Sequence, residues 1–354
     1  MIESKFHTLY GRAPEITAFT PGRVNLLGEH TDYNGGLALP ATIGLGIKIA
    51  ISNRIDSSIN ISSSTFEGMV ALKLDTTASQ HWSDYALGAA IKANELALTS
   101  GGADILIESN LPHGAGLSSS AALTVGLLKI FRDKAASDIT DTQIAQYAKQ
   151  IENEFIGVPC GIMDQMVIAN ALSGHAMKLD TDNLEFEHIP LNPEFRMVVI
   201  HSGFYRQLSD GRYKIRKKEC DEIKEIVNQN DICRMPLEKL EKLKLVDPTL
   251  FLRARHCITE HERTQQAAKA LKDDNFVEFG QLMNESHQSM KNDFEITLLE
   301  IDNLVADAIK LGALGARQTG GGFGGCIVAC VEADQVETWT AALLSNHPKA
   351  YYVC

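Results

Sequence analysis

The chain has 354 residues, 33 basic and 45 acidic side chains, a formal net charge of −12 and 44% hydrophobic residues. This composition excludes the disordered, collagen-like and coiled-coil classes, and the length suffices for about two domains, each with its own core. The acidic balance predicts no binding to nucleic acid or membranes, because such binding depends on basic side chains that neutralise phosphates.

The protein is expected in the cytoplasm as a monomer. No apolar run approaches the ~18 residues of a membrane span, and the opening residues lack the pattern of a secretory signal. Seven scattered cysteines without a C-x-x-C pair indicate neither a disulfide framework nor a zinc site. No heptad pattern or long apolar stripe indicates a subunit interface.

The first half of the chain mixes strand and helix periodicities. Short apolar, β-branched runs predict strands at 43–52, 69–74 and 103–109. Helical spacing predicts helices at 84–98, 121–134, 142–155 and 163–172. The second of these helices should begin at Ser118 to Ser120, whose hydroxyls can cap its exposed amide groups.

The second half is predicted to open with a strand at 196–201 and to continue in long charged helices between about Ser209 and Leu311. A glycine-rich stretch, an apolar strand at 326–331, a final helix and the terminal 351–354 segment follow. We place a domain boundary near residue 195, which gives domains 1–195 and 196–354.

The stretch 111–122, Leu-Pro-His-Gly-Ala-Gly-Leu-Ser-Ser-Ser-Ala-Ala, is a glycine-containing turn between a strand and a helix. Such a turn suits an anion, because glycines admit a phosphate close to the backbone and the helix presents unpaired N–H groups. Its serines could reach phosphate or Mg²⁺. It is no Walker A loop, since no lysine lies between His113 and Lys129. On its own, a capped helix start explains the stretch equally well.

The stretch 21–36 is too polar for a core segment and carries Glu29, His30 and Asp32 within four residues of a predicted loop. Carboxylates there suit a ligand with several hydroxyl groups, because they accept hydrogen bonds and exclude analogues that lack the donor. Arg23 could meet a phosphate with its planar fork. Taken singly, each of these residues could also be a solvated loop charge.

Two further stretches call for an explanation. Asp164 is an isolated acid at the start of an apolar helix, so it is either stabilised by the helix dipole or a catalytic carboxylate beside a hydroxyl nucleophile. The run 319–325, Thr-Gly-Gly-Gly-Phe-Gly-Gly, holds more glycines than a turn requires. Close approach to a ligand or to another loop is the natural reason.

These four stretches, in this order, resemble the motifs of the GHMP family of small-molecule kinases, and within it those of the galactokinases. The signature at 22–34, the nucleotide loop at 114–121 and the third motif at 320–326 carry the resemblance. Similar residues also occur at 160–165, 213–220, 285–297 and 351–354. The resemblance implies two α+β domains, an N-terminal one like domain 2 of ribosomal protein S5 and a C-terminal GHMP kinase domain, with the active site in the cleft between them.

The resemblance also implies roles for individual residues. Asp164 would take the proton of the sugar hydroxyl, and Arg23 beside it would stabilise the transferring phosphoryl group. ATP phosphates would lie on Gly114, Ala115, Gly116, Leu117, Ser118, Ser119 and Ser120, and Mg²⁺ on Ser120 and Glu152. The sugar would contact Glu29, His30, Thr31, Asp32, Gly161 and Tyr213.

The implied reaction is transfer of the ATP γ-phosphoryl group to the C1 hydroxyl of galactose. The segment 180–184, Asp-Thr-Asp-Asn-Leu, departs from the Asp-Cys-Arg-Ser-Leu that is usual in galactokinases, which keeps other sugars open. The alternatives are a kinase for N-acetylgalactosamine, galacturonate or L-arabinose, and a sensor that binds galactose and ATP without turnover. Glu29 disfavours a carboxylated sugar, and a purely structural protein would not explain four ordered motifs.

Overall fold

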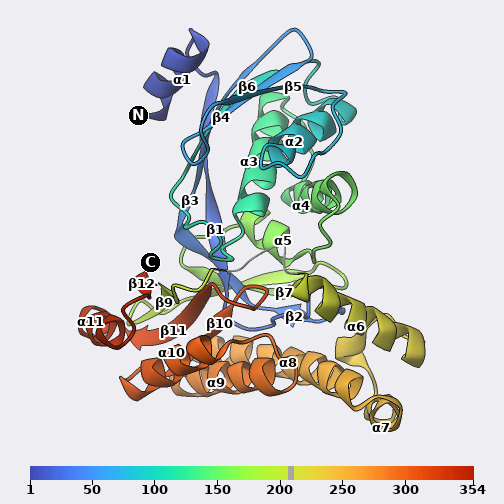
Figure 1. Ribbon diagram of the computed structural model, residues 1–354, viewed down its shortest axis with the longest axis vertical. Coiled ribbons are helices and arrows are strands. Elements are labelled where there is room, and N and C mark those ends of the chain that lie inside the picture. The colour runs from blue at the N-terminus through green and yellow to red at the C-terminus, as the bar shows by residue number, and fades with distance from the viewer. Residues whose placement is uncertain (206–210) are drawn as a thin grey trace. The chain divides into compact units, whose positions relative to one another are not determined.

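The computed structural model describes residues 1–205 and 211–354 and divides into two compact units that alternate along the chain (Figure 1). The first unit comprises 1–23, 43–111 and 118–171, and the second comprises 24–42, 112–117 and 172–354. This division follows packing and differs from a single boundary near residue 195. The predicted domain boundary stays a prediction.

The first unit is built on a mixed sheet. Its strands are β1 (Ile16–Asn25), β3 (Pro40–Asn53), β4 (Ser58–Ser63), β5 (Met69–Lys73) and β6 (Ala103–Ser109), of which β1 and β3 each extend by a few residues into the second unit. Strand β6 pairs antiparallel with β3 and parallel with β4. Alternate residues of β3 face opposite sides: Ala50 packs on helix α1 (Ile2–Tyr10), and Ile49 lies against helix α3 (Ser119–Lys134).

The helices of the first unit cover the other face of this sheet (Figure 1). They are α2 (Asp84–Glu95), α3 (Ser119–Lys134), α4 (Asp141–Gln150) and α5 (Met163–Ala169), so α2 and α5 end about one turn earlier than predicted. The third predicted helix is two elements, because α4 passes at Ile151 into a π-helix, η1 (Ile151–Ile156). A π-helical turn inside an α-helix is rare and often marks a functional site.

The second unit holds two groups of strands. Strand β7 (His175–Asp180) pairs with β2 (Leu37–Ala38) and with β8 (Phe186–Pro190). The other group is an antiparallel sheet in the order β10 (Gly315–Thr319), β11 (Cys326–Glu332), β9 (Phe195–His201) and β12 (Tyr351–Tyr352). All residues of β10 and six of the seven in β11 are buried. Burial on both faces explains why β11 is a near-continuous run of small and apolar residues, whereas β10 buries Arg317, Gln318 and Thr319.

Long helices pack on the β10–β11 sheet (Figure 1). The helices of this unit are α6 (Arg212–Val227), η3 (Ile232–Arg234), α7 (Leu237–Val246), α8 (Pro248–Lys272), α9 (Phe276–Asn292), α10 (Leu299–Lys310) and α11 (Val336–Asn346). The predicted helical region is confirmed from Arg212 to Lys310, whereas its predicted start at Ser209 lies outside the described residues. Helix α8 begins at Pro248 because Asp247 caps it, accepting the amide hydrogens of Thr249 and Leu250.

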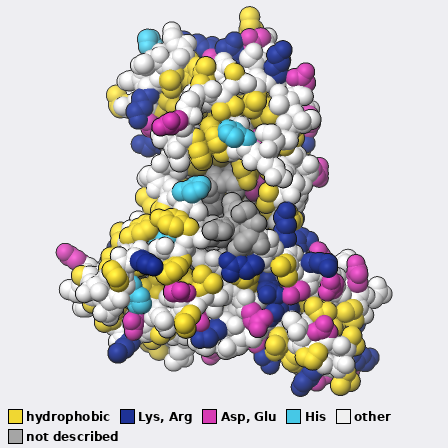
Figure 2. Space-filling model, in the orientation of Figure 1, with side chains coloured by type: hydrophobic (Ala, Val, Ile, Leu, Met, Phe, Trp, Pro, Cys, Tyr) yellow, Lys and Arg dark blue, Asp and Glu magenta, His cyan; other side chains and the backbone are white. Residues whose placement is uncertain are grey.

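Charged side chains of both signs are interspersed on the face drawn in Figure 2. Throughout 1–205 and 211–354, no helix combines the length and the apolar composition that crossing a lipid bilayer requires. All seven cysteines are described, and none of them is in a disulfide bond.

Candidate active site

In the first unit, the guanidinium of Arg23 forms two hydrogen bonds with the carboxylate of Asp164. Arg23 Nε donates to Oδ1 at 2.8 Å and Nη2 donates to Oδ2 at 2.9 Å, a fork-to-fork geometry. Arg23 is buried in strand β1, whereas the Asp164 side chain, in the first turn of α5, keeps 28% of its surface exposed. The structure thus presents one carboxylate, held in a fixed orientation, to a ligand.

Ser118 is the third member of this cluster. Its hydroxyl donates to Asp164 Oδ2 and makes no hydrogen bond to the amides of α3. The predicted capping role is therefore wrong for Ser118: its left-handed backbone, with φ of 62°, turns the side chain toward Asp164 instead. The helix still begins where predicted, directly after this residue. Ser119 is exposed and Ser120 half-buried.

Glu152 lies on the π-helix, almost fully buried beside this cluster. Its Oε1 accepts a hydrogen bond from Gln165 Nε2 at 2.8 Å, and the Ser120 side chain is close enough to lower the pKa of Glu152. Burial raises the pKa of Glu152 to about 7, opposed by the Gln165 hydrogen bond and reinforced by the charge of Asp164. A buried carboxylate of this kind is stabilised in its charged form by a cation.

The oxygens of Glu152 and Ser120 fit Mg²⁺, a hard cation that takes one or two protein oxygens and completes its shell with phosphate and water. The described part of the chain contains no group of three or more His, Cys, Asp or Glu side chains able to hold a metal.

In the second unit, the sugar-signature residue Glu29 is buried, with 3% of its surface exposed. Two donors meet at its Oε2: Asn25 Nδ2 at 2.6 Å and Arg317 Nη2 at 2.7 Å. Arg317 is itself completely buried, and its Nη1 donates to the carbonyl of Leu26 at 2.9 Å. Glu29 is thus no solvated loop charge but part of a buried ion pair.

A second acid, Glu260 on helix α8, holds the backbone of the signature loop. Its Oε1 accepts the Gly28 amide hydrogen at 2.9 Å and the Ser286 hydroxyl at 2.6 Å, and its Oε2 accepts from Arg263 Nε. Burial alone would raise the pKa of Glu260, but Arg263 and Arg317 outweigh burial and lower this pKa to about 2.

His256, also on α8, anchors the same loop one residue later. Its Nε2–H donates to the carbonyl of Glu29 at 3.0 Å, so its Nδ1 accepts from the Ser289 hydroxyl at 2.9 Å. Burial lowers the pKa of His256 to about 4, which keeps the ring neutral and fixes this tautomer near neutral pH.

His30 and Tyr213 lie together in an aromatic cluster of the second unit. The ring centroid of His30 lies 5.2 Å from that of Tyr213 and 4.8 Å from that of Phe294. The His30 Nδ1 lies 2.6 Å from the hydroxyl oxygen of Tyr33. His30 adopts φ of 61°, which is uncommon for a residue with a side chain and is typical of positions where surrounding structure fixes a functional group.

Three other predicted sugar contacts differ in their surroundings. The buried Thr31 hydroxyl lies 2.8 Å from the carbonyl of Leu37 and 2.9 Å from that of Gly28, so its visible contacts close the signature turn. Asp32 is half-buried in the second unit. Gly161 is buried in the first unit, three residues before Asp164.

The nucleotide loop begins in the second unit, where it meets the third glycine motif. A Cβ on Gly320 would lie 3.0 Å from the carbonyl oxygen of Gly116, and one on Gly325 would lie 3.0 Å from that of Ala115. Both glycines also have positive φ, of 84° and 87°. The glycine run therefore serves close approach between two loops, which was one of its two predicted explanations.

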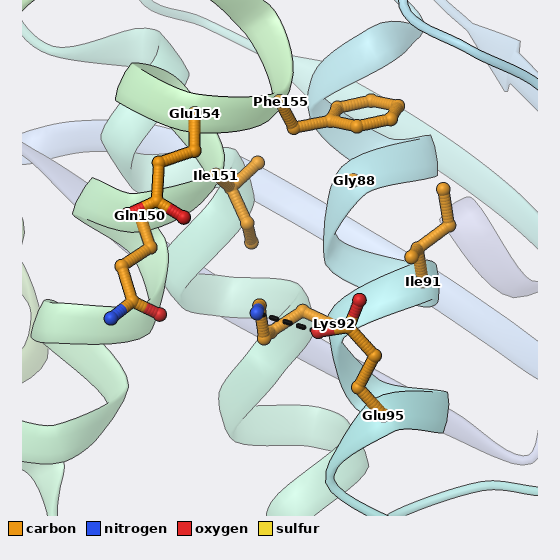
Figure 3. A pocket seen from close by; sticks show the side chains of 8 residues that line it. All are labelled: Gly88, Ile91, Lys92, Glu95, Gln150, Ile151, Glu154 and Phe155. Carbon is orange, nitrogen blue, oxygen red and sulfur yellow. Dashed lines mark ion pairs between the residues drawn. The ribbon is translucent and has the colours of Figure 1, made fainter.

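A pocket with an empty volume of about 520 Å³ lies between α2 and η1 of the first unit (Figure 3). Its lining includes the ion pair of Lys92 with Glu95, together with Gly88 and Phe155. Gly88 lets the two helices meet, since a Cβ there would lie 2.5 Å from Ile151. The lining residues include no predicted site residue.

The structure brings the predicted residues together in groups within each unit. Arg23, Asp164, Ser118, Ser120 and Glu152 form one group, while Glu29, His30 and Tyr213 share the second unit with Gly114–Leu117. Their individual roles stay predictions.

The sequence did not predict the residues that hydrogen-bond to the predicted site residues and their backbone. These are Asn25, Gln165, His256, Glu260 and Arg317. One signal was available. Arg317 is a single charge in a stretch of small residues, Gly-Ala-Leu-Gly-Ala-Arg, directly before the glycine run. A charge inside a buried strand requires a partner of opposite sign, but the sequence does not say which.

Three family models match this chain. The galactokinase galactose-binding signature matches residues 4–53, the GHMP kinase N-terminal domain matches 84–171, and the GHMP kinase C-terminal domain matches 267–348. Together they confirm the predicted two-domain α+β GHMP kinase fold.

Curated relatives match over nearly the whole chain. A galactokinase of Staphylococcus carnosus is 37% identical over 95% of this chain and 90% of its own length. One of Clostridium perfringens is 38% identical over 99% and 93%, respectively.

Solved structures agree. The galactokinase of Lactococcus lactis, crystallised with galactose, matches with a TM-score of 0.92 and 32% identity, over 99% of this chain and 96% of that one. A mevalonate kinase of Methanococcus jannaschii, 19% identical over 95% and 97% with a TM-score of 0.68, shares the fold. These matches do not favour the alternative sugar kinases or the sensor. The chain belongs to the galactokinase family of GHMP kinases, and it is an ATP-dependent sugar kinase.

Proposed function

We propose that this protein transfers the γ-phosphoryl group of ATP to the C1 hydroxyl of galactose, with Asp164 as the group that receives the hydroxyl proton. The observation that supports this proposal is the two-bond contact between the Arg23 guanidinium and the partly exposed Asp164 carboxylate. Such an arrangement fixes a proton acceptor in one orientation, which is what positional catalysis of a hydroxyl attack requires.

In the proposed step, the C1 oxygen forms a bond to the γ-phosphorus, and the bond from that phosphorus to the β–γ bridging oxygen breaks. The electron pair leaves with ADP, and the proton of the C1 hydroxyl passes to Asp164. Phosphoryl transfer depends mostly on alignment and on neutralising the phosphates. Arg23 contributes a positive charge next to the proton acceptor, and the Ser118 hydroxyl restrains the same carboxylate.

Ser120 and Glu152 would hold Mg²⁺. The metal would neutralise charge on the ATP phosphates when it is bound. The raised pKa of Glu152 supports this assignment, because a carboxylate whose burial disfavours its charged form gains most from a cation. Gly114 to Ser120 would supply amide and hydroxyl donors to the phosphates.

For the sugar, we assign Glu29, His30, Asp32 and Tyr213 as contacts, with Thr31 and Gly161 shaping the surrounding backbone. The buried setting of Glu29 supports a specificity role, since a buried carboxylate that loses its hydroxyl partner is left poorly satisfied. This would penalise sugars that lack the matching hydroxyl.

The experiment that tests the proposal measures ATP consumption by the purified protein with Mg²⁺ and a panel of sugars. The panel contains galactose, 2-deoxygalactose, talose, glucose, galacturonate, N-acetylgalactosamine and L-arabinose, and NMR assigns the phosphorylated carbon. We expect turnover of galactose to the 1-phosphate and almost none of glucose. Preferred turnover of another sugar would overturn the galactose assignment, and sugar binding without turnover would favour the sensor.

We also propose that the enzyme works as a monomer in the cytoplasm. The thiols of Cys220, Cys233 and Cys257, all buried and in no disulfide bond, suit a reducing compartment. Light scattering coupled to size exclusion tests the oligomeric state, and a mass near 77 kDa, twice the chain's 38.7 kDa, would overturn it.

A further inference from the structure

Two hydrogen-bond donors meet at one oxygen of the Glu29 carboxylate. Asn25 Nδ2 and Arg317 Nη2 both reach Oε2, at 2.6 and 2.7 Å. Asn25 is completely buried and comes from the end of β1, whereas Arg317 comes from β10, nearly 300 positions further along the chain. Two donors of different origin on one oxygen fix both the position and the rotation of the carboxylate.

Arg317 is well suited to this task because its own position is fixed. Its Nη1 donates to the Leu26 carbonyl at 2.9 Å and its Nε donates to the Gln318 carbonyl at 3.0 Å. No part of Arg317 is exposed. The guanidinium thus joins the backbone of the signature loop to the carboxylate three residues later, a pair of contacts that a planar fork can make and an ammonium cannot.

Asn25 is fixed in the same way. Its amide hydrogen is accepted by Thr319 Oγ1 at 2.9 Å, and the same hydroxyl donates to the Asn25 carbonyl at 3.0 Å. Strand β10 therefore holds both donors: Arg317 belongs to it, and Asn25 is tied to its last residue.

The pairing of buried charges explains why the Glu29 carboxylate needs a fixed geometry. A buried carboxylate costs free energy unless it is paired and hydrogen-bonded, and Arg317 meets that requirement directly for Glu29. Glu260 lies 3.7 Å from Arg317 Nη1 but has its own partner in Arg263. Arg317 is thus the direct ionic partner of Glu29, and its second acidic neighbour is separately neutralised.

We propose that Arg317 and Asn25 are positioning residues for sugar recognition: they hold the Glu29 carboxylate in the orientation in which it accepts a sugar hydroxyl. Neither residue is assigned a contact with substrate. The inference rests on the proposed function, in which Glu29 binds the sugar. It predicts that loosening either donor weakens discrimination at one hydroxyl while leaving the use of ATP unchanged.

The test compares kcat/KM for galactose and its 2-, 3-, 4- and 6-monodeoxy analogues in wild type, Glu29→Gln and Arg317→Lys. The analogue that lacks the hydroxyl bound by Glu29 should be disfavoured on the order of 10–100-fold by the wild type. Glu29→Gln should lose most of that preference. Arg317→Lys should lose it for the same analogue by about tenfold, and its KM for ATP should change less than twofold.

Arg255→Lys is the matched control. Arg255 is also an arginine of this unit that pairs with an acid, but its partner is Asp293 and not Glu29 or Glu260. Its discrimination profile should follow the wild type within twofold. An equal flattening in Arg255→Lys would overturn the proposal, because it would show a general loosening of the unit.

The outcomes separate this inference from the proposed function. If Glu29→Gln flattens the profile and Arg317→Lys lowers activity equally for all sugars, the positioning role is overturned while Glu29 keeps its role. If Glu29→Gln leaves the profile intact, Glu29 does not bind a sugar hydroxyl. The assignment of Glu29 as a sugar contact and the positioning role of Arg317 and Asn25 then both fail. If the wild type does not phosphorylate galactose, the proposed function itself fails.

Arg317→Lys could unfold the protein, so circular dichroism accompanies each variant and Asn25→Ala serves as the second variant. It removes the other donor to Glu29 Oε2 and leaves Arg317 in place. Its profile should flatten at the same analogue, by about threefold or more, whereas a uniform loss across all analogues would overturn the proposal.

Discussion

Gly320 and Gly116 approach so closely that a Cβ on Gly320 would lie 3.0 Å from the Gly116 carbonyl oxygen. We therefore expect Gly320→Ala to displace the nucleotide loop and to raise the KM for ATP about tenfold, with little change in the KM for galactose. Initial-rate kinetics with each substrate varied in turn check this.

Gly312→Ala is the control for that variant. Gly312 also has positive φ, of 112°, but a Cβ added there would have no atom of the described residues beyond its chain neighbours within 4 Å. Both variants should therefore lose about 1 kcal/mol of stability from backbone strain, and only Gly320→Ala should affect ATP. Equal effects on the KM for ATP would show that strain, and not close approach, explains the result.

Replacing Asp164 by Asn should lower kcat by about 10²–10⁴-fold, because the amide cannot accept the hydroxyl proton. ATP affinity, measured by titration calorimetry, should stay within about threefold of wild type. Asp141→Asn is a suitable control, since Asp141 is an aspartate of the same unit that pairs with Arg132. A kcat near the wild-type value in Asp164→Asn would contradict the assignment.

Glu152 gives the protein without metal a specific pH dependence. Its folded-state pKa of about 7 exceeds the value of 4.5 expected when unfolded, so between these values the folded state holds a proton that the unfolded chain releases. Its contribution to stability is therefore fully present below pH 4.5 and is lost as pH rises through 7, by about 3 kcal/mol.

Urea denaturation of the wild type and Glu152→Gln, in EDTA between pH 5 and pH 8.5, measures this contribution. The stability of the variant relative to the wild type should rise with pH over this range. Saturating Mg²⁺ should reduce the difference if Glu152 holds the metal. Parallel pH profiles of the two proteins would argue against a raised pKa.

His256 should make the folded state less stable as the pH falls, which is the opposite pH dependence to that of Glu152. Its pKa of about 4 lies below the 6.5 of the unfolded state, so protons bind preferentially to the unfolded chain as pH falls below 6.5. The resulting loss of stability reaches about 3 kcal/mol near pH 4. His256→Gln, whose amide can still donate toward the Glu29 carbonyl, should be less sensitive to acid, as denaturation at pH 4.5 and 6.5 would reveal.

The sequence predicted the motifs and most of the elements, because these depend on local composition. Glycines and serines after a strand indicated the nucleotide loop, and α3 begins within one residue of its predicted start. The split of α4 from η1 was not predictable, since a π-helical turn leaves the apolar spacing of 142–155 nearly unchanged. The Ser118 hydroxyl was assigned to capping because local rules favour it, whereas a contact with Asp164 spans 46 positions.

The burial of Glu29 was equally invisible in the sequence. A loop with Glu29, His30 and Asp32 is typical of a solvated segment, whereas its contacts with Arg317, Glu260 and His256 make it part of a core. Such contacts are set by tertiary packing over more than 200 positions, for which a single sequence carries no local signal.

Strand β10 and the glycine run after it have a consequence for insertions and deletions. Arg317 must face Glu29, and Gly320, three positions later, must face Gly116. Adding or removing one residue between them would reverse the alternation of side chains in the strand and move one of the two contacts to the opposite face. The segment from Arg317 to Gly320 therefore has a fixed length, because a change of one residue would disrupt either its contact with the signature loop or its contact with the nucleotide loop.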